Sequence, residues 1–231
     1  MNDELIQWLE NNEFASVMPF DLGIYPYFIF DFTDHNSELQ EIDMMDATAF
    51  EGYIFDKIKK HNAKYGIGLY LENRAIYRRS SVFTSREEER SVHLGIDIWI
   101  AEGTAVHAPL KGTIHSFNNN SSFGDYGPTL ILEHHYPSGV FYTLYGHLSQ
   151  DSMRAWEIGK TVEAGEIIAE LGSYEENVGY PAHLHFQIIR DMGDFSGDYP
   201  GVCRLSEIKK WAENSPDPSL ILKIPLSKAV N

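Results

Sequence analysis

The chain has 231 residues, 43% of them hydrophobic and 13% aromatic, which is enough apolar material for a folded core and excludes a disordered protein. Acidic residues outnumber basic ones by 34 to 18, so the formal net charge is −16 and nucleic acid is excluded as a ligand of most of the surface. The single cysteine, Cys203, permits neither an internal disulfide nor a four-cysteine zinc module. Any bound metal is therefore expected on histidines and carboxylates.

The first residues do not have the pattern of a secretory signal. Asp3 and Glu4 stand where such a signal carries basic residues, and no apolar run of the required length follows them. No stretch reaches the roughly 18 apolar residues of a membrane span. We therefore expect a cytoplasmic protein without a membrane span.

Residues 1–56 differ in charge from the rest of the chain, because they contain thirteen acidic residues and no Lys or Arg. The pattern here predicts a helix over Asp3–Asn11, a strand over Tyr27–Phe32, and a helix capped by Asp46. We expect residues 1–85 to form an acidic, mixed α/β extension. It either walls off one end of a binding groove or packs on the sheet to bury its aromatic side chains, Phe28, Phe30 and Phe50.

From Tyr65 onward, short apolar runs alternate with turn residues. They predict eight strands at roughly ten-residue intervals: Ile67–Leu71, Ile96–Ile100, Thr104–His107, Gly112–Phe117, Thr129–His134, Val140–Gly146, Glu166–Leu171 and His183–Ile189. This spacing predicts a mainly β fold, an antiparallel sandwich or barrel-like core, over residues 86–200. Residues 201–231 are expected to add a short helix, Ser206–Glu213 with Ser206 as its cap, and a tail packed on the core.

Two histidines lie two residues apart in the last of these strands. Successive side chains point to opposite faces of a strand, so His183 and His185 share one face roughly 6.6 Å apart. A single histidine is usually structural, but two on one strand face suggest metal binding or proton transfer.

The members of a second pair, His93 and Asp97, are four positions apart, which in a straight strand would place the two about 13 Å apart. Gly95 between them permits a bend that would bring the imidazole and the carboxylate together. A third candidate, His147, ends the β-type run F-Y-T-L-Y-G.

Together these three elements resemble the lysostaphin-type zinc metallopeptidases. The family motifs H-x-x-x-D, Y-x-H-L-S and H-x-H-F correspond here to H-L-G-I-D, Y-G-H-L-S and H-L-H-F, in the same order. Segments that connect these motifs, such as A-P-L-K-G-T-I and V-E-A-G-E-I-I-A-E-L-G, extend the resemblance over about residues 90–190.

The resemblance implies one zinc ion per chain, held by His93, Asp97 and His185, with a fourth position left for water. Strand spacing alone does not distinguish His183 from His185 as the ligand. By the same resemblance, His147 and His183 remain unligated and serve as acid and base groups. The implied function is metal-dependent hydrolysis of a peptide or amide bond in a small peptide or peptidoglycan-derived fragment.

The sequence departs from the family pattern in three respects: Gln187, the segment E-E-N-V-G-Y-P-A before the histidine pair, and an N-terminus without the expected pattern of an export signal. Gln187 stands where the family usually has Glu after H-L-H-F, which removes a charge beside the metal ligands. The segment E-N-R-A-I-Y-R-R-S resembles a cytosolic group, whereas extracellular members carry export signals. Arg74, Arg78 and Arg79 in this segment either bind a substrate carboxylate or form a solvated surface.

Two other classes compete with an enzyme. A non-catalytic zinc-binding regulatory or interaction domain with the same fold usually lacks one or more of the five site residues, and all five are present. A biotinyl or lipoyl carrier domain needs a modifiable lysine at a hairpin tip, and Lys111 lacks the flanking residues. The remaining candidates are interpreted as structural or surface residues: His107, His115, His134, His135 and, as a small buried hydrophobe, Cys203.

Overall fold

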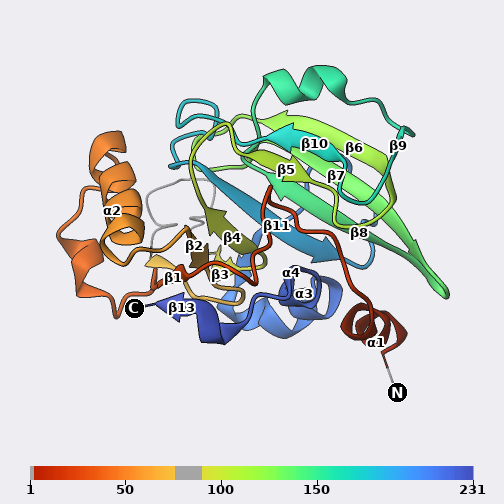
Figure 1. Ribbon diagram of the computed structural model, residues 1–231, viewed down its shortest axis with the longest axis horizontal. Coiled ribbons are helices and arrows are strands. Elements are labelled where there is room, and N and C mark those ends of the chain that lie inside the picture. The colour runs from red at the N-terminus through yellow and green to blue at the C-terminus, as the bar shows by residue number, and fades with distance from the viewer. Residues whose placement is uncertain (1–2, 76–89, 231) are drawn as a thin grey trace.

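A computed structural model describes residues 3–75 and 90–230 of the chain. Its dominant feature is a nine-stranded sheet with the strand order β13-β1-β2-β4-β11-β8-β7-β6-β9 (Figure 1). In the part of the sheet that runs β2-β4-β11-β8-β7-β6-β9, each strand pairs antiparallel with the next. Strand β1 differs, because it pairs in parallel with both β2 and β13.

The antiparallel part of this sheet carries most of the predicted strands. Its members are β2 (Tyr65–Gly68), β4 (Ile96–Trp99), β6 (Gly112–Asn120), β7 (Gly127–Tyr136), β8 (Gly139–Gly146), β9 (Thr161–Val162) and β11 (His183–Ile189). Strand β2 ends three residues before the predicted limit. The backbone leaves the extended region soon afterwards, since Leu71 adopts a left-handed φ of 56°.

Two short sheets complete the β structure. One pairs β5 (Ala105–His107) with β10 (Ile167–Glu170), and the other pairs β3 (Arg90–His93) with β12 (Val202–Arg204). Val106 and Ile168 from the first pair share a core with Leu130 and Leu132 of β7, so this pair forms a second layer on the large sheet. The mainly β, sandwich-like prediction is confirmed. The large sheet stays open, with β13 and β9 at its edges.

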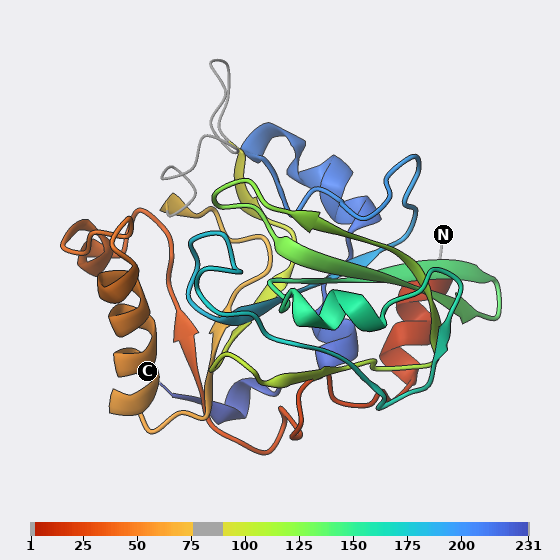
Figure 2. The ribbon, with the colours of Figure 1, turned by 90° about the horizontal axis from the view of Figure 1, so that it is seen from above.

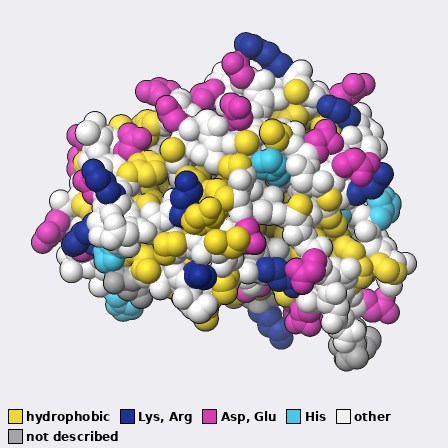
Figure 3. Space-filling view, in the orientation of Figure 1, with side chains coloured by type: hydrophobic (Ala, Val, Ile, Leu, Met, Phe, Trp, Pro, Cys, Tyr) yellow, Lys and Arg dark blue, Asp and Glu magenta, His cyan; other side chains and the backbone are white. Residues whose placement is uncertain are grey.

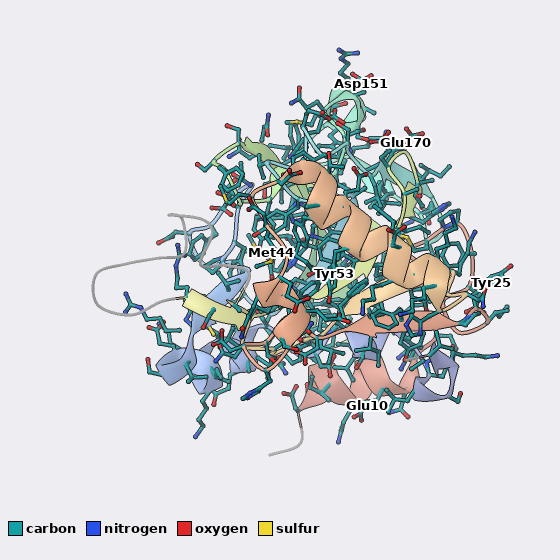
Figure 4. All side chains as sticks on the ribbon, turned by 90° about the vertical axis from the view of Figure 1, so that its left-hand side faces the viewer. Glu10, Tyr25, Met44, Tyr53, Asp151 and Glu170 are labelled. Carbon is teal, nitrogen blue, oxygen red and sulfur yellow. The ribbon has the colours of Figure 1, made fainter. Side chains whose placement is uncertain are left out.

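The N-terminal extension contributes α1 (Glu4–Asn11), β1 (Tyr27–Phe30), the 3₁₀ helix η1 (Ser37–Gln40) and α2 (Ala47–Lys60). Helix α2 begins as predicted, since the Asp46 side chain accepts a hydrogen bond of 3.1 Å from the Ala49 N–H. Figures 1 and 2 show α2 on one side of the molecule, and Figure 4 looks onto that side, where α2 crosses in front of the strands.

An aromatic cluster joins α2 and β1 to the main sheet. Its buried members, here called the extension cluster, are Phe30, Phe32, Leu39, Phe50, Ile54, Ile58, Trp99, Tyr180 and Val202. Phe30 and Phe50 are fully buried, as predicted, while Phe28 is partly buried against the same cluster. Trp99 and Tyr180 belong to the segment that carries the candidate site residues. The extension is therefore packed directly against that segment.

The C-terminal region contains the 3₁₀ helices η4 (Leu205–Glu207) and η5 (Leu226–Lys228), the helices α3 (Ile208–Asn214) and α4 (Ser219–Leu222), and β13 (Ala229–Val230). A further 3₁₀ helix, η3 (Asp151–Ala155), lies between β8 and β9. The prediction of Ser206 as a helix cap is wrong. Ser206 lies inside η4, and α3 starts after Glu207 without a side-chain capping bond. Within the described ranges, no helix is both long and apolar enough to cross a membrane.

The surface reflects the acidic composition. Figure 3 shows acidic side chains spread around the periphery of one face of the molecule. This distribution is consistent with the formal charge of −16.

Candidate metal centre

Strands β4 and β11 lie side by side in the main sheet and bring three of the candidate residues together. In their antiparallel register, His185 is opposite Asp97 and His183 is opposite Trp99. Side chains of directly opposed residues project from the same face, so the His185 imidazole and the Asp97 carboxylate meet. The distance between His185 Nδ1 and Asp97 Oδ1 is 3.2 Å.

His93 reaches the same point from a different sheet. It ends β3, and the chain bends at Gly95 before β4 begins, as the sequence predicts. A Cβ atom at Gly95 would lie 2.5 Å from His185 Cε1 and 2.8 Å from the Phe186 carbonyl oxygen. Only glycine permits this approach, and the resulting distance between His93 Nε2 and Asp97 Oδ1 is 3.1 Å.

The three side chains form a compact triangle. His93 Nε2 lies 2.9 Å from His185 Nδ1, which completes a set of separations between 2.9 and 3.2 Å. Ligands of a tetrahedral zinc ion, at about 2.0–2.1 Å from the metal, stand roughly 3.3 Å apart. All three residues are buried, at 1% to 3% exposure. The donor set and its spacing therefore fit a zinc ion.

Hydrogen bonds fix which nitrogen of each ring can bind a metal. His93 Nδ1 lies 3.0 Å from the Leu69 carbonyl oxygen, which accepts but cannot donate, so Nδ1 carries the proton and Nε2 keeps its lone pair. In the second imidazole, His185 Nε2 lies 3.0 Å from Gln187 Oε1. Gln187 Nε2 donates to the Pro200 carbonyl oxygen at 3.1 Å, which turns Oε1 toward the ring and leaves His185 Nδ1 free as a ligand.

The same contacts explain why an amide suits position 187. A carboxylate would orient His185 equally well, but its second oxygen would face the Pro200 carbonyl oxygen, and Gln187 is fully buried. The departure from the family pattern therefore matches the local hydrogen-bonding requirement.

Burial and neighbouring charge keep the cluster in the form that binds cations. Burial, with the Arg74 charge, lowers the pKa of His93 to about 3, so the ring is neutral at physiological pH. Burial opposes the charge on Asp97, but its contacts with His93 and Arg74 outweigh this and hold its pKa well below the usual value. A neutral His93 imidazole beside the ionised Asp97 carboxylate is the form that zinc requires.

The two remaining histidines stand beside this triangle. His183 Nε2 is 4.0 Å from Asp97 Oδ1, while its Nδ1 donates to the Pro181 carbonyl oxygen at 2.8 Å. His147 follows β8 with a left-handed φ of 63°, held by a 2.8 Å hydrogen bond from its N–H to the Tyr126 carbonyl oxygen. The centres of the His147 and His183 rings are 4.0 Å apart. All five predicted site residues therefore lie in one place.

Burial lowers the pKa of His183 to about 4 and that of His147 well below its usual value, so both rings are neutral. His147 Nδ1 is buried and has no hydrogen-bond partner among the described residues. A neutral, unpartnered imidazole nitrogen remains available for proton transfer.

The cluster opens into a cavity of about 310 Å³. Asp97, His147, His183 and His185 line it together with the aromatic residues Trp99, Tyr126 and Tyr180. Charged side chains also reach this cavity: Arg74, Arg90, Asp125 and Asp198. Burial and the nearby Asp198 raise the pKa of Asp125 to about 6.

Arg74 occupies a different environment from the solvated surface considered in the sequence. It is 2% exposed and contacts two carboxylates of the protein, Glu72 and Asp97. The sequence offers no signal for this contact, because it depends on the turn that follows β2. Arg78 and Arg79 lie outside the described residues.

The other candidate residues lie away from the triangle. His134 is buried and bonded to the Lys111 carbonyl oxygen and to Thr143, whereas His135 is exposed. Cys203 is a buried free thiol, as predicted.

Residues 91–196 match the model for peptidase family M23. This match confirms the resemblance of residues 91–196, here called the M23 segment, to the lysostaphin-type metallopeptidases.

Individual relatives match only parts of the chain. A Haemophilus influenzae protein described as an uncharacterized metalloprotease is 34% identical over 95 residues, or 41% of this chain. The match spans only 18% of that relative's length. Among solved structures, a zinc-containing peptidase from Vibrio cholerae is 26% identical, with 42% of this chain and 27% of that one covered and a TM-score of 0.36. The catalytic domain of lysostaphin from Staphylococcus simulans is 25% identical over 52% of this chain and 80% of that one, with a TM-score of 0.37.

Proposed function

We propose that the protein is a zinc-dependent metallopeptidase that hydrolyses a peptide or amide bond. The observation that carries this proposal is the buried triangle of His93 Nε2, Asp97 Oδ1 and His185 Nδ1, with separations of 2.9 to 3.2 Å, inside an M23 domain.

In this proposal His93, Asp97 and His185 hold one zinc ion per chain. Three protein ligands leave a fourth coordination position, the arrangement found in catalytic zinc sites. When bound, zinc supplies a Lewis acid that polarises a carbonyl group and lowers the pKa of a water molecule toward about 7.

His183 is suited to accept a proton. Its Nδ1 proton is committed to the Pro181 carbonyl oxygen, so Nε2 presents a lone pair on the side of Asp97. His147, whose Nδ1 has no partner among the described residues, is suited to donate a hydrogen bond to the developing oxyanion. The proton that His183 accepts is then available for the leaving amine. Their adjacent rings allow both groups to reach one scissile bond.

The cavity suggests the class of substrate. Its volume of about 310 Å³ fits a short peptide segment, at the lower end of small-molecule pockets. Two carboxylates, Asp125 and Asp198, line it, so it favours a substrate with a free amine. Small peptides and peptidoglycan-derived fragments carry such a group.

The test combines metal analysis with hydrolysis assays. The purified protein should contain about one zinc per chain, and Asp97→Ala should lose it. His147→Ala and His183→Ala should retain zinc while hydrolysis of a responsive peptide falls by roughly 10²-fold or more. The matched control is His135→Ala, the same change at an exposed histidine, which should alter neither property.

The outcomes separate the roles and the alternatives. Zinc that persists in Asp97→Ala would remove this residue from the ligand set. Zinc loss in His183→Ala with retention in His185→Ala would exchange the roles of these two residues. A zinc-loaded wild type inactive on both short peptides and peptidoglycan fragments would favour the non-catalytic zinc-binding domain.

A further inference from the structure

A buried row of charged side chains leads to the candidate metal centre from outside the M23 segment. Arg74 Nε donates to Glu72 Oε2 at 2.8 Å, and Arg74 Nη1 donates to Asp97 Oδ2 at 2.5 Å. Arg74 and Asp97 are each 2% exposed, and Glu72 is 9% exposed. Glu72 and Arg74 precede residue 91, where the family match begins.

The two oxygens of Asp97 have different partners. Oδ1 faces His93 Nε2 and His185 Nδ1, whereas Oδ2 is bound by the Arg74 guanidinium. A carboxylate held in this way can offer one oxygen to a metal but cannot rotate to offer both. Because three protein ligands and one open position are needed for tetrahedral zinc, single-oxygen binding by Asp97 preserves the open position.

The surrounding backbone is built to hold the guanidinium in place. The Arg74 N–H donates to the Ser91 carbonyl oxygen at 2.8 Å, which ties Arg74 to β3, the strand that ends in His93. Across β2, a Cβ atom at Gly68 would lie 2.5 Å from Arg74 Nη2 and 3.1 Å from Asp97 Oδ2. The far end of the row is also fixed, since Glu72 Oε1 accepts a hydrogen bond of 3.1 Å from the Phe32 N–H.

We infer that Arg74 is a positioning residue of the metal centre, which restricts Asp97 to single-oxygen coordination and so maintains a four-coordinate metal with one open position. Glu72 orients the guanidinium from its other side. The inference rests on the metal site proposed above. It predicts that the residues required for correct coordination extend at least seventeen positions N-terminal to the family match.

Cobalt(II) substitution tests this inference directly, because four-coordinate cobalt absorbs visible light more strongly than five- or six-coordinate cobalt. In Arg74→Gln, release of Oδ2 should let Asp97 bind through both oxygens, so the visible absorption of the cobalt protein should fall. Arg74→Lys keeps the charge but offers a point donor in place of the planar fork, and should give an intermediate spectrum. Competition with a chelator should show metal affinity reduced about tenfold or more in Arg74→Gln, within the usual range for partners of metal ligands.

Arg190→Gln is the matched control. It makes the same change at an arginine that pairs with Asp3 and does not line the cavity, so it should leave the cobalt spectrum and the metal affinity unchanged. Wild-type cobalt spectra and metal affinities in folded Arg74→Gln would overturn the inference. Should Arg74→Gln fail to fold, Arg74→Lys decides, and a wild-type spectrum and affinity in that variant would overturn it. A wild type that binds neither zinc nor cobalt would instead refute the metal site itself.

Discussion

Phe50, on helix α2 of the extension, is predicted to support the candidate active site from a distance. It is fully buried, and its ring centre lies 6.2 Å from that of Trp99 and 6.4 Å from that of Tyr180. Trp99 in turn stacks on His183 with ring centres 4.0 Å apart, and the Tyr180 ring lies 5.5 Å from that of His147. One aromatic layer therefore separates Phe50 from both proposed acid–base groups.

Phe50→Ala should be costly for stability and for catalysis. Truncation of a buried Phe to Ala lowers the free energy of unfolding by about 3–5 kcal/mol, through lost burial and the cavity left behind. For a chain of this size, 1 kcal/mol corresponds to about 2–4 °C in melting temperature, so the expected decrease is about 6–20 °C. Loosening of Trp99 and Tyr180 should also lower kcat by roughly 10-fold or more, since small misplacements of catalytic groups have large effects. Zinc content should be retained, because Phe50 contacts none of the three proposed ligands.

The assay is thermal unfolding of the zinc-loaded protein, followed by circular dichroism and by tryptophan fluorescence. Glu51→Ala is the control, an exposed position on the same helix, and should change the melting temperature little. Both signals should report one transition, because β1 and β2 of the extension lie in the same sheet as β4 and β11. A separate, earlier transition for the extension, or a decrease below about 2 °C in Phe50→Ala, would refute this reasoning.

Two further substitutions test the geometry around His185. Gly95→Ala would place a Cβ atom 2.5 Å from His185 Cε1 and 2.8 Å from a backbone oxygen, so we expect the variant to lose most of its zinc, as measured by elemental analysis. Normal zinc content in that variant would show that the close approach of β4 and β11 is not required. Gln187→Glu would restore the residue usual in the family but set a carboxylate oxygen against the Pro200 carbonyl oxygen, at the position where Nε2 now donates over 3.1 Å. Its melting temperature should fall, by the equivalent of about 1–3 kcal/mol for an unsatisfied buried polar contact; a variant as stable as the wild type would contradict this account of position 187.

The sequence predicted local features of the site better than its long-range pairing. The Gly95 bend followed from the residue type and from the need to bring His93 and Asp97 together. The strand pattern did not distinguish His183 from His185 as the expected metal ligand, because both side chains project from the same strand face. In the structure, the register of β11 against β4 places His185 opposite Asp97, and that register depends on strands 88 residues apart in the chain.

Sequence patterns also could not predict which strands of the sheet pair with the strand of the extension. The strand expected over Tyr27–Phe32 forms over Tyr27–Phe30, but its parallel pairing with β2 and β13 depends on elements that are distant in sequence. Hydrophobic alternation identifies a strand without identifying its neighbours. The Ser206 cap was wrong for a related reason, since a cap residue type predicts a helix start only if the chain folds as an α-helix at that point, and here it forms η4.

The position of the extension bears on how the metal centre is stabilised. The Leu69 carbonyl oxygen fixes the proton on His93, the Arg74 guanidinium binds Asp97, and Phe50 supports the aromatic residues beside His183 and His147. All three contributions come from residues before the family match, while the proposed ligands lie within it. Metal binding to the native state should therefore stabilise the extension together with the M23 segment, because ligand binding stabilises every element that must be folded for the site to exist.

Removal of residues 1–60 would take β1 out of the sheet and Phe50 out of the extension cluster, so that deletion would test folding rather than access to the groove. Single charge changes on the exposed face of α2 leave both in place, and they are the appropriate way to ask whether the extension also controls which substrates reach the cavity.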